Sequence, residues 1–213
     1  MLIWYARPED VTVPNITFPD KNLETAIRDA LGKPVGEGIT AAELASLTEF
    51  SPRGRGITNL SGLEYCINLT RLRLYENEIT DVSPLSSLTN LKGLGLSENQ
   101  ISDISPLSSL TNLTWLYLWD NQISDISALS SLTALTELKV SRNQISDISA
   151  LTGLTNLEFL ELGHNNISDI FPLVENHGLS VGGIVDLSGN PLSITSVNVY
   201  ILELDARDIE VRY

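Results

Sequence analysis

Hydrophobic residues recur along most of the chain in a pattern that repeats every 22 positions. Beginning at Leu69, Leu91, Leu113, Leu135 and Leu157, five successive segments read L-x-x-L-x-[LV]-x-x-N-x-I-[ST]-D-[IV]. Self-similarity at one fixed period indicates a chain built by stacking copies of a single structural unit. The sequence therefore predicts a solenoid, with five regular copies over residues 69–178.

An irregular copy precedes the regular ones, and another follows them. Upstream, Phe50 stands in register with the repeated leucines, but Arg55 occupies the position of the repeated asparagine. Downstream, Asn190 follows Asn165 by 25 residues instead of 22. We expect repeats over residues 47–190, within one continuous domain.

Each regular copy reads as a short strand followed by a tight return segment. In L-x-x-L-x-L the apolar residues alternate with variable ones, which places the leucines inward and the residues between them outward. Strands of successive copies would then pair in parallel, about 4.8 Å apart. After the asparagine, apolar residues recur at three-residue spacing, which suits a 3₁₀ turn. Because strands line one side and compact turns the other, we expect a curved stack with the parallel sheet on its concave face.

Two polar columns belong to the turns of the repeat. An asparagine side chain can bond the backbone groups that a corner leaves without a ladder partner. An aspartate just before a helical turn caps free backbone amides, so we interpret the aspartates as caps and not as a row of calcium ligands. The two columns are Asn77, Asn99, Asn121, Asn143 and Asn165, and Asp81, Asp103, Asp125, Asp147 and Asp169.

A solenoid must close its ends, and the N-terminal flank has the signals of helices. Asp20 precedes an amphipathic helical pattern that Gly32 stops. Thr40 and Glu43 then stand at the spacing of a capping box. We expect a helical cap over residues 16–46.

The C-terminal flank also predicts a cap, over residues 191–213. Apolar residues around Tyr200 indicate a final helix, and residues 209–213 are suited to a terminal strand. At the other end, residues 1–15 are expected to form an extension whose apolar stretch is too short for a membrane span or a signal sequence. We expect Met1 to begin a fragment of a longer polypeptide.

The charge of the chain limits the classes of molecule that it can bind. The 27 acidic and 13 basic residues give a formal net charge of −14, which repels phosphate backbones and anionic lipids. The charge argues against nucleic acid as a partner and favours a soluble monomer that does not insert into membranes.

The chain lacks the residue patterns that enzymes need. Its two histidines, His164 and His177, have no serine or cysteine nucleophile motif around them. The single cysteine, Cys66, falls in the column of Leu88, which predicts a buried apolar role and excludes an internal disulfide. No phosphate loop or zinc motif is present. We expect no enzymatic activity, no catalytic residue, no metal and no cofactor.

Function must then come from the outward strand positions, because the fold alone does not specify it. Aromatic residues alternate with leucines on one strand, a neighbouring strand has two glycines in the same columns, and the strand before that has two arginines. We expect a groove with the glycines at its base and arginine and aromatic side chains at its sides. The candidate partner-binding residues are Arg71, Arg73, Tyr75, Gly93, Gly95, Trp115, Tyr117, Trp119, Glu137, Lys139, Phe159 and Glu161.

The sequence of the repeat resembles that of a known protein family. The unit NLTWLYLWDNQISDISALSSLT, residues 112–133, resembles the 22-residue leucine-rich repeats of bacterial internalin-like surface proteins. Residues 16–34 and 39–50 resemble the helical N-terminal cap of such proteins, and GNPLS at 189–193 resembles the start of their C-terminal end. The resemblance implies an α/β leucine-rich-repeat solenoid that is secreted or displayed at the cell surface as a binding module or adhesin.

Three interpretations of the outward face remain open. The first is a protein- or peptide-binding module, in which the rings contact a partner and the arginines meet its acidic groups. The second is a glycan-binding surface, with rings stacked on sugars. The third is a structural spacer of a longer surface protein, whose rings merely pack on each other to cover the sheet.

Overall fold

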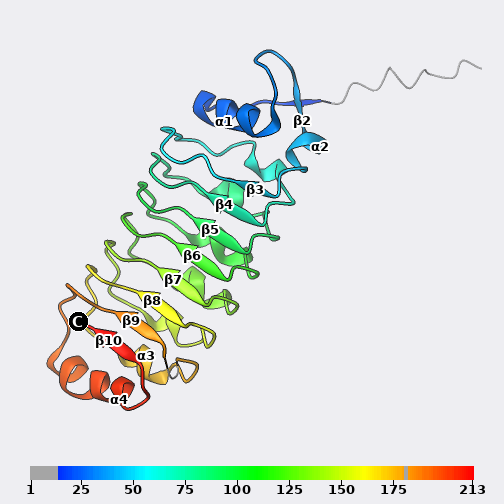
Figure 1. Ribbon diagram of the computed structural model, residues 1–213. Helices are drawn as coiled ribbons and strands as arrows, with labels where there is room; N and C mark the ends of the chain where they lie inside the picture. The colour runs from blue at the N-terminus through cyan, green and yellow to red at the C-terminus, as the bar shows by residue number, and fades with distance from the viewer. Residues whose placement is uncertain (1–13, 180–181) are drawn as a thin grey trace, which may run out of the picture.

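The computed structural model describes residues 14–179 and 182–213, so the expected extension over residues 1–15 lies almost entirely outside the described part. Eight strands form one parallel sheet along one side of a curved stack (Figure 1). The predicted leucine-rich-repeat solenoid is therefore confirmed. In chain order the strands are β3 (Glu49–Phe50), β4 (Arg71–Arg73), β5 (Gly93–Gly95), β6 (Trp115–Tyr117), β7 (Glu137–Lys139), β8 (Phe159–Glu161), β9 (Ile184–Asp186) and β10 (Glu210–Arg212).

The register of the sheet follows the sequence period. Arg71 pairs with Gly93, Gly93 with Trp115, and each later pairing also advances by 22 residues until Phe159, which pairs with Ile184. The last step is longer because this copy contains the insertion. Equivalent residues of successive copies therefore stand side by side across the concave face.

Short helical turns return the chain on the opposite side of the stack. Five of them are 3₁₀ turns, as predicted, but the copy with the insertion forms a short α-helix, α3 (Phe171–Glu175). The extra residues give that copy room for the wider turn, which the amide of Asn176 closes by donating to the carbonyl of Pro172. The 3₁₀ turns are Leu63–Tyr65, Ser83–Leu85, Ser105–Ser109, Ser127–Ser131 and Ser149–Leu151.

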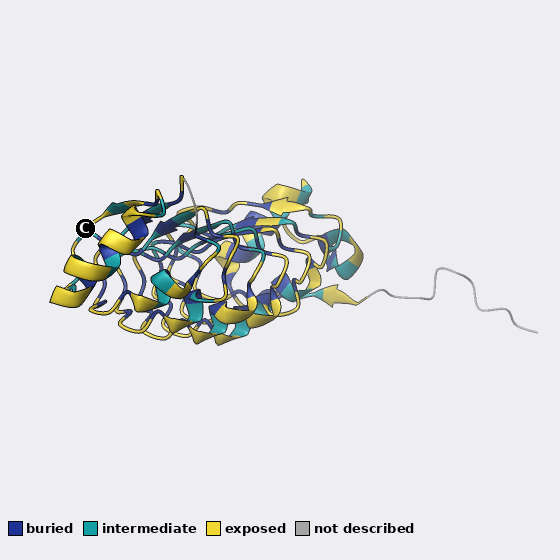
Figure 2. Cartoon of the chain, turned by 90° about the horizontal axis from the view of Figure 1, so that it is seen from below, coloured by how far each residue is buried: buried dark blue, intermediate teal, exposed yellow. Residues whose placement is uncertain are grey.

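The apolar core runs the length of the stack between the strands and the turns (Figure 2). Each regular copy contributes the same inward columns, and residues such as Leu94, Leu116 and Leu138 have no exposed surface. Cys66 is buried in the column predicted for it. The core is continuous from copy to copy, so each repeat depends on its neighbours for burial.

The buried asparagines form the predicted ladder. The Oδ1 atom of Asn121 accepts from the amide of Ile101 in the preceding copy at 2.9 Å. Its Nδ2 group donates to the carbonyls of Leu96 at 3.1 Å and Leu118 at 3.0 Å. The other ladder asparagines repeat this arrangement. Each amide thus joins its own corner to that of the preceding copy.

The corner also imposes an unusual backbone conformation that the sequence pattern did not reveal. The residue before each of the five ladder asparagines has φ between 53° and 58°, in the left-handed region that non-glycine residues disfavour. In the two irregular copies the equivalent position is a glycine, Gly54 or Gly189. The regular copies tolerate this conformation because the asparagine bonds hold the corner.

At the N-terminal end, α1 (Lys21–Leu31) is tied to the first irregular copy through Asp20. One carboxylate oxygen caps the helix by accepting from the amides of Asn22 and Leu23, and the other accepts from the amide of Thr58 at 2.7 Å. Burial raises the pKa of Asp20, but the backbone hydrogen bonds outweigh this effect and lower it overall. Gly32 ends the helix in a left-handed conformation, as predicted.

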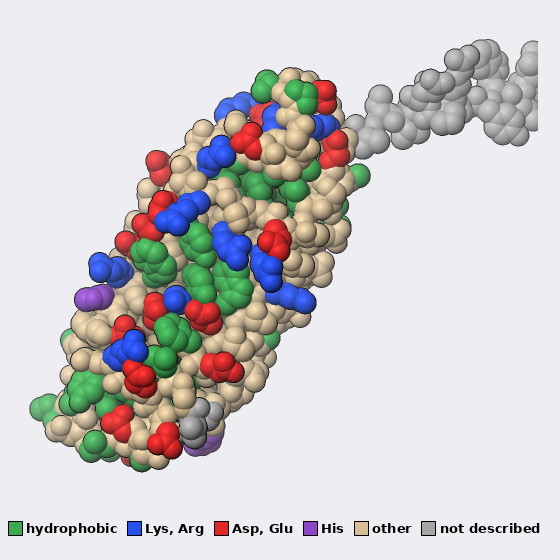
Figure 3. Space-filling model, viewed as in Figure 1, with side chains coloured by type: hydrophobic (Ala, Val, Ile, Leu, Met, Phe, Trp, Pro, Cys, Tyr) green, Lys and Arg blue, Asp and Glu red, His purple; other side chains and the backbone are tan. Residues whose placement is uncertain are grey.

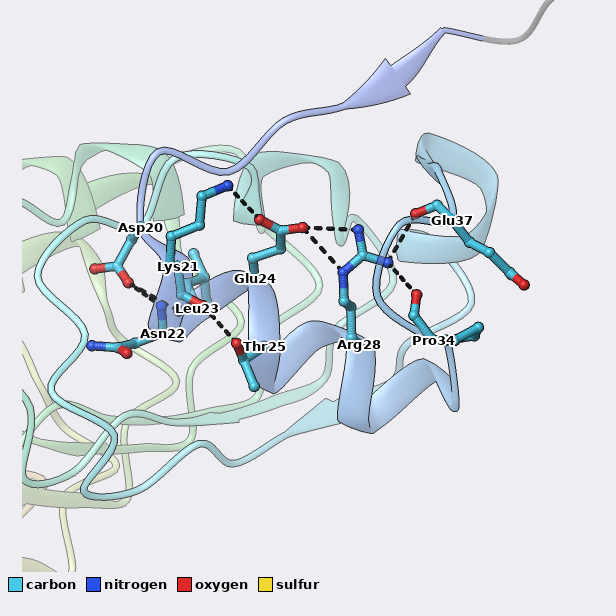
Figure 4. A network of polar contacts seen from close by, with 9 residues as sticks. All are labelled: Asp20, Lys21, Asn22, Leu23, Glu24, Thr25, Arg28, Pro34 and Glu37. Atoms are coloured by element: carbon cyan, nitrogen blue, oxygen red, sulfur yellow. Dashed lines mark hydrogen bonds and ion pairs between the residues drawn. The ribbon is translucent and has the colours of Figure 1, made fainter.

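Arg28 anchors the segment that follows α1. Arg28 pairs with Glu24 on α1 and donates to the carbonyls of Pro34 at 2.9 Å and Glu37 at 2.8 Å (Figure 4). The chain then forms β2 (Ile39–Thr40), antiparallel to β1 (Asn15–Ile16), and the short helix α2 (Ala41–Leu44).

At the C-terminal end, a π-helical turn (Ser196–Tyr200) continues into α4 (Ile201–Asp205), and β10 adds a last parallel strand beside β9. Arg207 donates to the carbonyls of Val174 at 3.0 Å and Asn176 at 2.6 Å, which ties this end to α3. None of the helices in the described ranges is long and apolar enough to traverse a lipid bilayer.

We predict that Asn121→Ala lowers the unfolding free energy by about 2–4 kcal/mol, because it leaves buried backbone groups of two copies without partners. Asn112→Ala is the matched control. Asn112 makes one exposed bond, to the carbonyl of Thr89 at 2.8 Å, and its loss should cost below about 1 kcal/mol. Urea unfolding followed by circular dichroism measures both, and equal losses would contradict a stabilising ladder.

A second prediction concerns the capping box of α2, which is present as expected. Thr40 and Glu43 bond each other reciprocally, and the ammonium of Lys33 lies 2.6 Å from the Glu43 carboxylate. The hydrogen bond from Lys33, with those from Thr40, lowers the pKa of Glu43 from 4.5 to about 2. A carboxylate with a lowered folded pKa stabilises the fold above its unfolded pKa and loses that contribution as pH falls through the folded value.

The difference in unfolding free energy between the parent and Glu43→Gln should therefore be largest above pH 4.5 and shrink as pH falls toward about 2. The same comparison in a Lys33→Gln background provides the control and should show a smaller pH dependence. Denaturant unfolding at a series of pH values tests this. A difference that stays constant from pH 6 to about 2 would count against the assigned pKa.

Candidate binding surface on the concave face

Three columns of outward side chains cross the concave face. In the first regular copy they begin with Arg71, Arg73 and Tyr75. Hydrophobic and basic side chains gather over the middle of this face (Figure 3). Trp115, Tyr117 and Trp119 all lie on it and are partly exposed, as predicted.

The expected open groove over β5 is wrong. Gly93 and Gly95 are buried, because rings from the neighbouring copies lie directly on them. A Cβ atom at position 93 would stand 2.0 Å from the indole of Trp115, and one at position 95 would stand 2.3 Å from the ring of Tyr75. The glycines thus receive the aromatic rings of the protein itself and do not form a base open to a ligand.

The central cluster consists of Arg73, Trp115, Tyr117, Lys139 and Phe159. The ring centroids of Trp115 and Tyr117 are 4.9 Å apart. The guanidinium of Arg73 lies 5.3 Å from the centroid of the Trp115 ring. The ammonium of Lys139 lies 5.2 Å from the ring centroid of Tyr117 and 4.8 Å from that of Phe159. Cation–ring and ring–ring contacts therefore connect these side chains across four strands, β4 and β6 to β8.

Two acidic candidates hold the lysine of this cluster in place. The ammonium of Lys139 is 3.4 Å from the carboxylate of Glu137 and 3.2 Å from that of Glu161. Burial, with the adjacent Glu137 carboxylate, raises the pKa of Tyr117, so its hydroxyl remains protonated at neutral pH. The surface offers ring faces here, and the Tyr117 hydroxyl adds no negative charge to it.

A small hollow of about 170 Å³ borders the cluster at the carboxyl-terminal ends of the strands. The predicted residues Tyr75, Tyr117, Trp119 and Lys139 line it, together with Arg53 and Glu98. Arg53 was not among the predicted residues because it belongs to the irregular first copy, although it stands 22 residues before Tyr75, in the same column. Arg53 forms an ion pair with Glu76.

A second hollow, of about 350 Å³, opens at the amino-terminal ends of β4, β5 and β6. The predicted residues Arg71 and Trp115 line it with Lys92, Thr70 and Thr114. Lys92 was also missed, since it lies one position before its strand. Comparison of that column would have singled it out, because the regular copies otherwise have Thr70, Thr114, Thr136 and Glu158 there.

Groups that enzymes use are not assembled in the described ranges. His164 and His177 are exposed, and no three potential metal-ligating side chains cluster among the described residues. Burial raises the pKa of Cys66 to about 12, which leaves its thiol protonated and unreactive at neutral pH.

The aspartate column caps the turns, as predicted. The carboxylate of Asp103 accepts from the amide of Ser105 at 2.8 Å, and Asp125 accepts from Ser127 in the same way. These hydrogen bonds lower the pKa of both aspartates.

Comparisons with known proteins agree with this architecture. A family model of paired leucine-rich repeats matches residues 67–109 and 111–153, and a single-repeat model matches residues 153–170. Internalin H of Listeria monocytogenes is 40% identical over 77 residues, which are 34% of this chain and 14% of that protein.

Two crystal structures of Listeria monocytogenes internalins are similar over most of the chain. The internalin InlF has a TM-score of 0.70 and 34% identity, covering 91% of this chain and 63% of that one. Internalin C2 has a TM-score of 0.67 and 34% identity, covering 91% of this chain and 93% of that one. The chain thus spans less than two thirds of internalin H and of the InlF structure, but nearly all of the internalin C2 structure.

The chain belongs to the family of bacterial internalin-like leucine-rich-repeat proteins. Its fold supports a protein-interaction module in general, and proteins of this class are typically binding modules without enzymatic activity.

We predict that Gly93→Ala displaces the Trp115 ring, because the new Cβ cannot share its space, at a cost of about 1–2 kcal/mol. Gly153→Ala is the control, since Gly153 is exposed and a Cβ there would meet nothing within 4 Å. The indole N–H signal of Trp115 in an NMR spectrum reports the ring's position. An unshifted signal in Gly93→Ala would show that the glycine does not determine where the ring lies.

Proposed function

We propose that this domain binds a protein or peptide ligand on its concave face, with the central cluster as the main contact. The observation that carries the proposal is the series of contacts between partly exposed rings and cations across four strands, Arg73 to Trp115 to Tyr117 to Lys139 to Phe159. Aromatic residues and arginine are enriched among the residues that contribute most to protein–protein binding.

The cluster is organised before a ligand arrives. Trp115 rests on Gly93 and stacks under Arg73, and Lys139 is held between Glu137 and Glu161. Side chains already restricted in the free protein lose less conformational freedom on binding, so more of the contact energy appears as affinity. Family membership supports an extracellular or cell-surface recognition role for such a surface.

The packing of the aromatic rings is also consistent with rings that only cover the sheet and bind no ligand. The two roles differ in what happens when rings are removed: a covering role affects stability alone, whereas a binding role affects capture of a ligand by a protein that is still folded. Trp115 and Trp119 are suitable positions because both remain partly exposed.

We predict that Trp115→Ala/Trp119→Ala weakens binding to selected peptide ligands by about 100-fold or more, as expected for two central aromatic contacts. The ligands are obtained by selecting a phage-displayed random peptide library on the parent domain, and affinities are measured by titration calorimetry. Ile194→Ala/Leu202→Ala is the matched control, because these exposed apolar residues lie near the C-terminal end, away from the concave face.

Circular dichroism establishes that both variants are folded. Equal affinities of the parent and the ring variant would overturn the assignment of the binding face. A glycan array that detects ring-dependent binding, when the peptide library yields no ligand, would favour the glycan alternative instead.

A further inference from the structure

The hollow at the amino-terminal ends of β4, β5 and β6 is lined by two basic side chains whose donors can face a ligand. Its threonines are already committed: the hydroxyl of Thr70 donates to the carbonyl of Thr48, and that of Thr114 donates to the carbonyl of Lys92. The charged donors left to face a ligand are the guanidinium of Arg71 and the ammonium of Lys92, which line the hollow together with Trp115. We call these three residues the basic corner.

The charges of the basic corner are only weakly compensated. Lys92 makes no ion pair with any described carboxylate. Arg71 pairs with Glu49 at 2.7 Å, but both side chains are 52% exposed, and such surface pairs contribute little and exchange readily. Arg73, whose guanidinium stacks over the Trp115 ring, also lacks a carboxylate partner among the described residues. Three cations thus adjoin one indole ring.

The positive charge is local to these copies. In the two columns that form the corner, other copies carry the acidic residues Glu49, Glu137 and Glu158, and the whole chain has a net charge of −14. A polyanion such as a nucleic acid or a heavily sulfated glycan would be repelled by that overall charge. A single carboxylate within a mixed protein segment would meet the local cations without that penalty.

We propose that the basic corner is a subsite for an aspartate or glutamate side chain of the protein ligand, and this inference rests on the proposed function. Because Trp115 belongs both to the corner and to the central cluster, the ligand's acidic residue must stand close to an aromatic or large aliphatic residue that contacts the rings. The protein thereby recognises an acidic–apolar pair in an accessible segment.

The test uses the same random peptide selection on the intact domain, carried out at about 50 mM and about 300 mM salt. We expect the enriched peptides to share an aspartate or glutamate next to an aromatic or large aliphatic residue, with weaker enrichment at the higher salt. The variant Arg71→Gln/Lys92→Gln should bind the best acidic peptide about tenfold more weakly or worse. It should bind the Asn or Gln version of that peptide as the parent does.

Lys21→Gln/Arg142→Gln is the charge-matched control, because it removes two exposed cations outside the basic corner and should leave both affinities unchanged. Enriched peptides without an acidic residue, or equal losses for the acidic and amide peptides, would overturn the subsite while leaving the binding function intact. No enriched peptide at all would reject the proposed function itself. Displacement of the acidic peptide by inorganic sulfate at comparable concentration would identify a general anion site and overturn the assignment to a protein carboxylate.

Discussion

The structure depends on satisfying buried backbone groups at the corner of every repeat. No regular ladder reaches these groups, and a buried amide or carbonyl without a partner is costly. The asparagine of each regular copy supplies the missing bonds and reaches into the preceding copy, as Asn121 does to Ile101 and Leu96. These bonds keep the corners of successive copies in the same geometry, both in the 22-residue copies and across the longer step from Asn165 to Asn190, and they accompany the positive φ that precedes each ladder asparagine.

The constant length of the regular copies organises the binding surface. With every strand advancing by the same number of residues, equivalent variable positions align across the sheet, and side chains far apart in sequence become neighbours. The two glycines of β5 then have a specific effect. They leave space into which Trp115 and Tyr75 lean from opposite sides, so that the rings lie along the sheet and Arg73 can stack on one of them. The result is a flat, preorganised surface of rings and cations in an otherwise acidic protein.

The candidate site combines two chemistries that a protein ligand can meet together. The central cluster offers apolar ring faces, and the basic corner offers donors without a firm acidic partner. Glu137 and Glu161 restrain Lys139, whereas no described carboxylate pairs with Lys92. The cations of this face therefore divide into those held by the protein's own carboxylates and those available to a ligand. This division is the physical basis for expecting selectivity for ligands that carry a carboxylate beside an apolar side chain.

The sequence by itself determined the period, the strands, the asparagine ladder, the capping aspartates and the face on which Trp115, Tyr117 and Trp119 lie. These features depend on residues one copy apart, and the repeat displays them directly. The tertiary structure decided how outward side chains of different copies meet. It closed the expected groove by laying rings on Gly93 and Gly95, and it placed Lys92, from the position before its strand, and Arg53, from the irregular first copy, beside the predicted residues. Column position gives a side chain's direction, but its rotamer and the space left by neighbours settle its contacts, and those exist only in the folded stack.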